Sequence, residues 1–98
     1  MASRFKFLPS VGIPYAEQGR IFFSCQTYGN QPDHMRERIE LVCLAAAGGE
    51  QSCADALKIY MCTDRSYNAV CMDFFISTAK LDRLRRRFYQ LYAGGERM

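Results

Sequence analysis

Apolar side chains recur every three or four residues along the last third of the chain, between Tyr67 and Tyr92. At the α-helical step of about 100° per residue, most of them fall on one face. The residues that share this face are Val70, Phe74, Leu81, Leu84, Phe88 and Leu91. One long helix, or two helices joined at Ser77-Thr78, would both produce the pattern. Either arrangement must bury its apolar face against further elements, which predicts a mostly α-helical fold.

Two earlier stretches have the same spacing. The first follows Pro32-Asp33 and stops at Gly48-Gly49, which predicts a helix over residues 33–47. The second follows Ser52, a residue type favoured at helix N-caps, and predicts a helix over residues 53–61. Thr63 is the next candidate cap, so a further helix is expected over residues 63–76, ending there or continuing to Tyr92.

Residues 1–30 have a different pattern, in which glycine and proline separate short apolar runs. The segment from Arg20 to Tyr28 is rich in aromatic and β-branched residues and closes on Gly29-Asn30, which favours a short strand. It would pair with Arg4–Leu8 or lie as an arm on the helices. We therefore expect one domain over residues 1–98, with an extended or β arm (residues 1–30) and a core of three or four helices (residues 33–92).

Several classes of protein do not fit this sequence. No apolar run approaches the roughly 18 residues of a membrane span, and Pro9, Gly12 and Pro14 interrupt any secretory signal. The cysteines form no CxxC pair, and His34 is the only histidine, so neither metal nor cofactor is expected. The five thiols, Cys25, Cys43, Cys53, Cys62 and Cys71, are interpreted as small hydrophobic side chains in a reducing cytoplasm.

Catalysis is also not expected. General acid–base or nucleophilic chemistry needs a base beside a nucleophile, and His34 lies one residue after a predicted helix start, where exposure is usual. Gly48-Gly49 lacks the Lys and Ser/Thr of a phosphate-binding loop. We predict a non-enzymatic protein that acts by binding a partner.

Positive charge is concentrated at the end of the chain. Residues 80–98 carry a net charge of +4, from six basic and two acidic side chains, while the first 79 residues carry −1, from seven basic and eight acidic ones. With the apolar stripe buried, the side chains expected on the exposed side are Lys80, Arg83, Arg86, Arg87 and Gln90. Arginines suit bidentate contacts to phosphates, so Lys80, Arg83, Arg85, Arg86 and Arg87 are predicted phosphate-binding residues. A merely solvated helix face is the alternative.

The helix at 53–61, the tight turn after it and the helix that begins at Thr63 have the layout of a helix-turn-helix. In that motif the first residues of the second helix enter the major groove of DNA. The predicted reading residues are Arg65, Ser66, Tyr67 and Asn68, whose side chains suit base edges or phosphates.

The order of these elements resembles the PapB/FocB-type regulators of fimbrial operons. The matching stretches are Arg38-Ile39 through Gly48-Gly49, Ser52 with Lys58-Ile59-Tyr60-Met61, and Leu81 through Tyr92, within residues 33–92. The resemblance implies a cytoplasmic, DNA-binding transcriptional regulator that forms dimers or higher oligomers along its site.

A different class of function remains open. Eight aromatic residues are candidates for exposure and for burial by a partner: Phe5, Phe7, Phe22, Phe23, Tyr28, Phe88, Tyr89 and Tyr92. The chain would then be a small accessory, chaperone-like or inhibitor protein, for example one encoded by a phage, whose arginine and aromatic face binds an acidic protein. DNA binding should weaken steeply with salt, and an interface with an apolar centre far less.

Overall fold

The computed structural model describes residues 5–96, which fold into α-helices with no β-strand. The prediction of a mostly α-helical fold is therefore confirmed, although the helices number five within the described residues. They are α1 (Tyr15–Gln26), α2 (Asp33–Ala46), α3 (Gln51–Cys62), α4 (Tyr67–Phe74) and α5 (Thr78–Glu96). Two single 3₁₀ turns, η1 (Pro9–Val11) and η2 (Tyr28–Asn30), flank α1.

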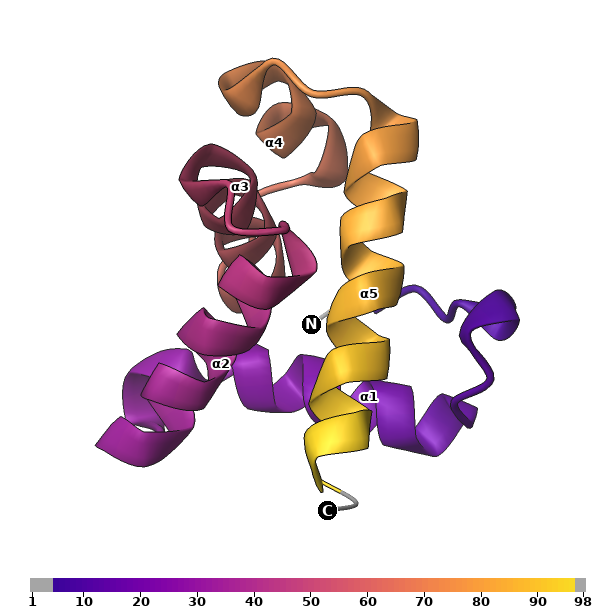
Figure 1. Ribbon diagram of the computed structural model, residues 1–98, viewed down its shortest axis with the longest axis vertical. Helices are drawn as coiled ribbons and strands as arrows, with labels where there is room; N and C mark the ends of the chain where they lie inside the picture. The colour runs from indigo at the N-terminus through magenta and orange to yellow at the C-terminus, as the bar shows by residue number, and fades with distance from the viewer. Residues whose placement is uncertain (1–4, 97–98) are drawn as a thin grey trace.

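The longest helix, α5, is the axis of the fold (Figure 1). It lies beside α2 and α3, while α1 crosses near its C-terminal half and α4 lies beside its N-terminal end. The apolar face of α5 is buried by these neighbours, with Leu81 and Phe88 both fully inaccessible to solvent. Burial of side chains of this size typically stabilises a fold by about 1.5–3 kcal/mol each. The part of α5 predicted to be apolar from the spacing is thus the side that packs against the other helices, except at Leu91, which is 40% exposed.

The predicted strand over residues 20–28 is wrong, because most of this segment belongs to α1. Ile21, Phe22 and Cys25 lie one, three or four residues apart, and all three side chains are buried in the core. Their β-branched and aromatic character favours a strand, but burial of one helical face outweighs a local preference of this kind. Within the described part of the proposed partner segment, Phe5 to Leu8, the backbone forms no strand, and Arg4 lies outside the described residues.

The segment before α1 is attached to the helices by one buried side chain. Gln18 is completely buried, and its Oε1 accepts a hydrogen bond from the backbone N–H of Leu8 at 3.0 Å. Its Nε2 donates to the carbonyl oxygens of Leu8 and Ile13, both at 2.9 Å. Leu8, Val11 and Ile13 are buried, so the N-terminal arm is a packed part of the domain.

Helices α2 and α3 begin and end close to the predicted positions. Positive φ angles at Gly48 (65°) and Gly49 (87°) end α2 as expected, because glycine adopts this conformation without steric cost. The caps predicted for the next two helices are wrong. Glu50, not Ser52, precedes α3, and Ser66, not Thr63, caps α4 by accepting a hydrogen bond from the backbone N–H of Ala69 at 3.1 Å.

No helix within residues 5–96 has both the length and the apolar character that crossing a membrane would require.

Candidate functional site

The turn between α4 and α5 consists of Phe75, Ile76 and Ser77. Phe75 adopts the left-handed conformation, with φ 55° and ψ 43°, and is the only residue other than glycine with a positive φ among those described. The backbone N–H groups of Phe75 and Ile76 both donate to the carbonyl oxygen of Cys71, which ends α4. Helices α4 and α5 are thus joined by only three residues, one helix further along the chain than the pair predicted from the sequence.

The next helix, α5, starts with a capped and exposed N-terminus. The Ser77 Oγ accepts a hydrogen bond from the backbone N–H of Lys80 at 3.0 Å, and Ser77 is thus the N-cap. Thr78 and Ala79, in the first turn, are exposed. The hydroxyl of Tyr67, at the start of α4, donates hydrogen bonds to the Thr78 carbonyl and to the Asp82 carboxylate, both at 2.7 Å. These contacts join the first turns of the two helices.

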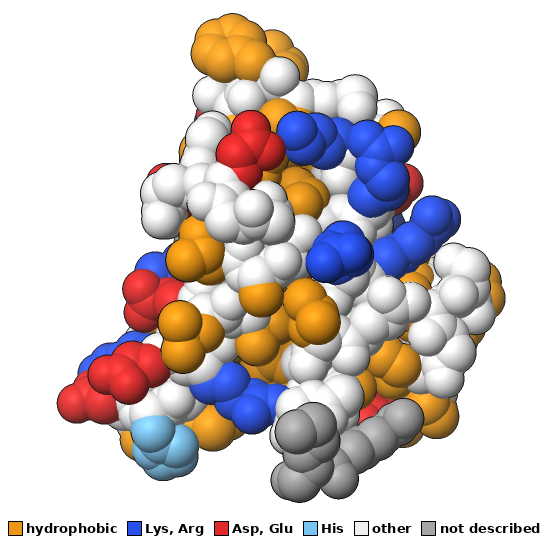
Figure 2. All heavy atoms as spheres, viewed as in Figure 1, with side chains coloured by type: hydrophobic (Ala, Val, Ile, Leu, Met, Phe, Trp, Pro, Cys, Tyr) orange, Lys and Arg blue, Asp and Glu red, His pale blue; other side chains and the backbone are white. Residues whose placement is uncertain are grey.

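Three exposed arginines, Arg83, Arg86 and Arg87, follow on the outer side of α5, and we call them the α5 basic face. Figure 2 shows basic side chains gathered over this part of the helix. None of the three pairs with an acidic side chain among residues 5–96, whereas Lys80 Nζ lies 3.7 Å from a carboxylate oxygen of Glu50. The α5 basic face therefore presents three guanidinium groups to solvent.

Arg85 does not belong to this face. Its side chain is buried, so it is not available for the phosphate contact predicted from the sequence. Only 3% of the residue is exposed. Its guanidinium donates hydrogen bonds to the Lys6 carbonyl (3.0 Å) and to Asp82 (3.2 Å), and lies 5.3 Å from the centre of the Tyr60 ring. The helical step of about 100° already places position 85 between Leu81 and Tyr89 on the inner side of α5, a signal that the sequence contained.

The predicted reading residues at the start of α4 are mostly engaged inside the protein. Arg65 pairs with Asp73, with Nη2 2.7 Å from Oδ2, and Ser66 caps α4. The Tyr67 hydroxyl is held by α5, and burial together with the hydrogen bond to Asp82 raises its pKa well above the ordinary value. Asn68 is the one predicted reading residue that is exposed without a contact among the described residues.

The aromatic residues divide between core and surface. Phe22, Phe88, Tyr89 and Tyr92 are buried, so these four expected exposed aromatics belong to the core instead. Phe23 and Phe7 are exposed, at 67% and 39%, while Phe5 and Tyr28 are half-buried. The most exposed large apolar side chains are two that the sequence analysis did not single out, Phe75 at 94% and Met72 at 75%. Figure 2 shows hydrophobic side chains projecting at the top of the view, the end of the molecule where α4 lies in Figure 1.

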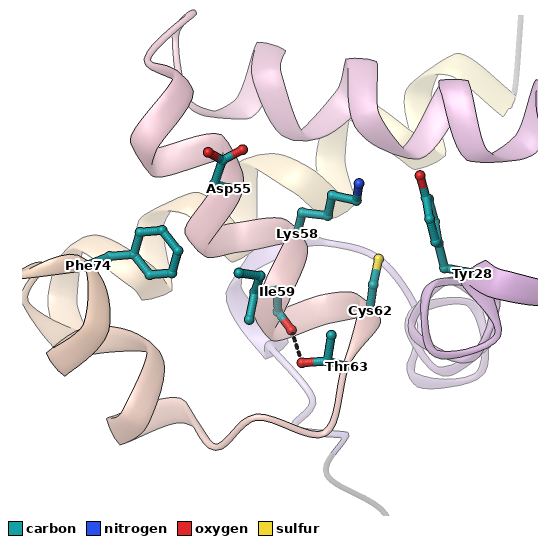
Figure 3. A pocket seen from close by; sticks show the side chains of 7 residues that line it. All are labelled: Tyr28, Asp55, Lys58, Ile59, Cys62, Thr63 and Phe74. Carbon is teal, nitrogen blue, oxygen red and sulfur yellow. Dashed lines mark hydrogen bonds between the residues drawn. The ribbon is translucent and has the colours of Figure 1, made fainter.

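A pocket of about 450 Å³ opens beside the C-terminal end of α3 (Figure 3). Its lining residues are Tyr28, Asp55, Lys58, Ile59, Cys62, Thr63 and Phe74. The Tyr28 hydroxyl donates a hydrogen bond to Glu40 at 2.6 Å, and Lys58 Nζ lies 3.6 Å from the same carboxylate. The hydrogen bond from Tyr28 lowers the pKa of Glu40, and Lys58 adds to this effect.

Among the described residues, no group of three or more metal-ligating side chains converges on one point. His34 is exposed near the start of α2. No family model, no curated protein and no solved structure matches this chain.

Proposed function

We propose that this protein binds double-stranded DNA through a helix-turn-helix formed by α4 and α5, with α5 as the reading helix. The proposal rests on one arrangement. A three-residue turn connects α4 to α5, the first turn of α5 is exposed, and the α5 basic face follows it. A helix is about 10–12 Å wide with its side chains and fits the major groove of B-DNA, which is about 12 Å wide.

The exposed residues of α5 have chemistry suited to this role. Thr78, in the first turn, has a hydroxyl that can bond base edges and a methyl group that can contact thymine. Arg83, Arg86 and Arg87 follow about one and a half to two and a half turns later, where they would bind phosphates or guanine edges. Lys80 is part of the same surface once its ion pair with Glu50 opens. Arg85 is omitted because it is buried, and Arg65 because it is paired with Asp73.

Fluorescence anisotropy of labelled duplex DNA with the full chain tests this proposal. We expect micromolar binding at low salt that falls log-linearly as salt rises. The double variant Arg83→Gln with Arg87→Gln should weaken binding and reduce the slope of log K against log salt by about two, because each lost phosphate contact removes about one.

A matched control removes the same charge elsewhere. Arg20→Gln with Arg36→Gln changes exposed or half-exposed arginines on α1 and α2, and should leave most of the affinity intact. Equal loss in both double variants would mean that net charge, not α5, drives binding. Absence of binding at low salt would refute the proposal. The stoichiometry of the titration also tests the predicted homodimer.

A second candidate function, binding of an acidic protein partner, is favoured by one observation. Phe75 and Met72 expose apolar surface three residues apart, at the same end of the molecule as the start of α5. Such side chains suit the apolar centre of an interface whose rim is the α5 basic face. This alternative would be favoured if binding of an acidic protein changes little with salt and is lost in Phe75→Ser but not in Arg83→Gln with Arg87→Gln.

A further inference from the structure

The C-terminal ends of α1 and α3 are fastened together by Gln26. Its Nε2 donates hydrogen bonds to the carbonyl oxygens of Met61 at 2.6 Å and Thr63 at 3.0 Å. Cys25 precedes Gln26, and Cys62 lies between the two acceptor residues. The two hydrogen bonds therefore hold the backbones of two cysteines beside each other, although 36 residues separate them in the chain.

The two thiols lie close enough for each to shift the pKa of the other, but they differ in access to solvent. Cys25 is completely buried, whereas Cys62 is partly exposed and lines the pocket beside Lys58 and Tyr28. Figure 3 shows the Cys62 sulfur pointing into the space between these two side chains. A small reagent that enters the pocket meets Cys62 first, with Cys25 directly behind it.

The surroundings shift the pKa values of the two thiols in opposite directions. The hydrogen bond from Cys25 lowers the pKa of Cys62 and the Lys58 ammonium adds to this, while burial and the Glu40 carboxylate oppose it. The same hydrogen bond, burial and Cys43 raise the pKa of Cys25, and burial raises that of Cys43. The thiolate is the reactive form of cysteine, so we expect Cys62, which has the lower pKa and the greater exposure, to react before Cys25.

We propose that Cys62 and Cys25 form an oxidation site at which a peroxide produces an intramolecular disulfide between α1 and α3. The Cys62 thiolate attacks one oxygen of the peroxide, the O–O bond breaks, and a sulfenic acid and hydroxide (or alkoxide) result. The Cys25 sulfur then attacks the Cys62 sulfur, an S–S bond forms, the S–O bond breaks, and water leaves with the Cys25 proton. The two thiols lose two electrons in total, which reduce the peroxide.

The fold is arranged to accept this bond. A disulfide needs two side chains already close to each other, and the Gln26 hydrogen bonds hold the end of α1 that carries Cys25 against the end of α3 that carries Cys62. The bond closes the chain between residues 25 and 62, so it restricts the unfolded state and should raise the melting temperature of the oxidised protein.

Peptide mapping after oxidation tests the proposal directly. The folded full chain is treated with hydrogen peroxide, remaining thiols are alkylated, and the protein is digested with trypsin. Cleavage at lysine and arginine separates Cys25 (residues 21–36) from Cys62 (residues 59–65), with Cys71 on a third peptide and Cys43 and Cys53 together on a fourth. We expect an intact monomer lighter by two hydrogen atoms and a linked pair of peptides 21–36 and 59–65, both reversed by a reducing agent.

Variants separate this outcome from general thiol oxidation. Cys62→Ser and Cys25→Ser should each abolish the linked pair, and Cys25→Ser should leave Cys62 as a trappable sulfenic acid. Cys71→Ser is the matched control, because this buried thiol lies on α4 away from the pair, and it should form the link normally. A link from Cys62 to Cys43, links only between chains, or oxidation of Cys71 at the same rate as Cys62 would each overturn the proposal. Since DNA plays no part in the assay, its result is independent of the proposed DNA binding.

Discussion

A hydrogen bond joins Arg85, in the middle of the last helix, to the backbone carbonyl of Lys6, 79 residues earlier in the chain. The guanidinium also bonds to Asp82 and stacks near the Tyr60 ring, so one buried cation connects the N-terminal segment, α3 and α5. Asp82 in turn accepts the hydrogen bond from Tyr67 of α4. The position of the proposed reading helix therefore depends on an interior arginine.

Arg85→Ala should destabilise the fold strongly, while Arg86→Ala should not. Loss of a charged hydrogen bond costs about 1.5–3 kcal/mol, and Asp82 and the Lys6 carbonyl would both lose a partner. Arg86 is exposed, and exposed substitutions usually change stability by no more than about 0.5 kcal/mol. Urea unfolding of both variants measures the difference. Equal unfolding midpoints would contradict the structural role assigned to Arg85.

Gln18→Leu should release the N-terminal segment. The substitution keeps the size of the side chain but leaves the Leu8 N–H and the Ile13 carbonyl without this partner, and the Leu8 carbonyl with only the 3.4 Å bond from the Val11 N–H. An unsatisfied buried group costs about 1–3 kcal/mol, so we expect a total loss of at least about 2 kcal/mol. Hydrogen exchange should also become faster at Leu8 and Val11. Gln90→Leu, on the exposed side of α5, is the control and should change neither quantity.

Phe75→Gly should stabilise the protein, whereas Phe75→Ala should not. The left-handed conformation costs a residue with a Cβ about 1–2 kcal/mol, and glycine avoids this cost but loses more backbone entropy on folding. The expected net gain is about 0.5–1 kcal/mol, since the exposed ring contributes little to packing. Thermal unfolding of the two variants provides the comparison. A gain in Phe75→Ala as large as that in Phe75→Gly would show that the ring, not the backbone, sets the effect.

Alkylation of Cys62 should proceed at lower pH than that of an ordinary thiol. Its pKa is lowered by the hydrogen bond from Cys25 and by Lys58, so its thiolate forms at lower pH than that of an unperturbed thiol. The rate of reaction with iodoacetamide in the folded protein, followed by mass spectrometry, should therefore reach half its maximum at lower pH for Cys62 than for Cys71. Cys71 is the control, because burial raises its pKa. The Cys25→Ser variant should shift the Cys62 midpoint upward if the hydrogen bond is the main cause.

The helices could be predicted where one apolar face repeats in sequence. The bounds of α2 and α3 differ from the predicted ones by one or two residues, and the stripe from Val70 to Phe88 is the buried side of α4 and α5. The burial of Arg85 also follows from the pattern, because its angular position on α5 lies among apolar residues. Residue type alone places arginine at the surface, and here the position on the helix outweighs it.

The error over residues 20–28 has a different origin. A strand was favoured by residue types that are common in sheets, but a strand needs a partner, and the described part of the chain offers none. As a helix, the same residues bury Ile21 and Cys25 against α3 and α5. Here contacts with distant elements decided between two local conformations that the sequence alone allowed.

The sequence by itself determined the helical class, the apolar face of α5 and the concentration of arginine on its outer side, because these properties depend on residues a few positions apart. Only the tertiary structure decided which arginine is interior, how Gln18 holds the N-terminal segment, and that Cys25 meets Cys62. Each of these depends on contacts between segments remote in the chain or on the packing of whole helices. The physical reason is that local spacing sets which side of a helix is apolar, while the partners of that side are chosen by packing the whole chain.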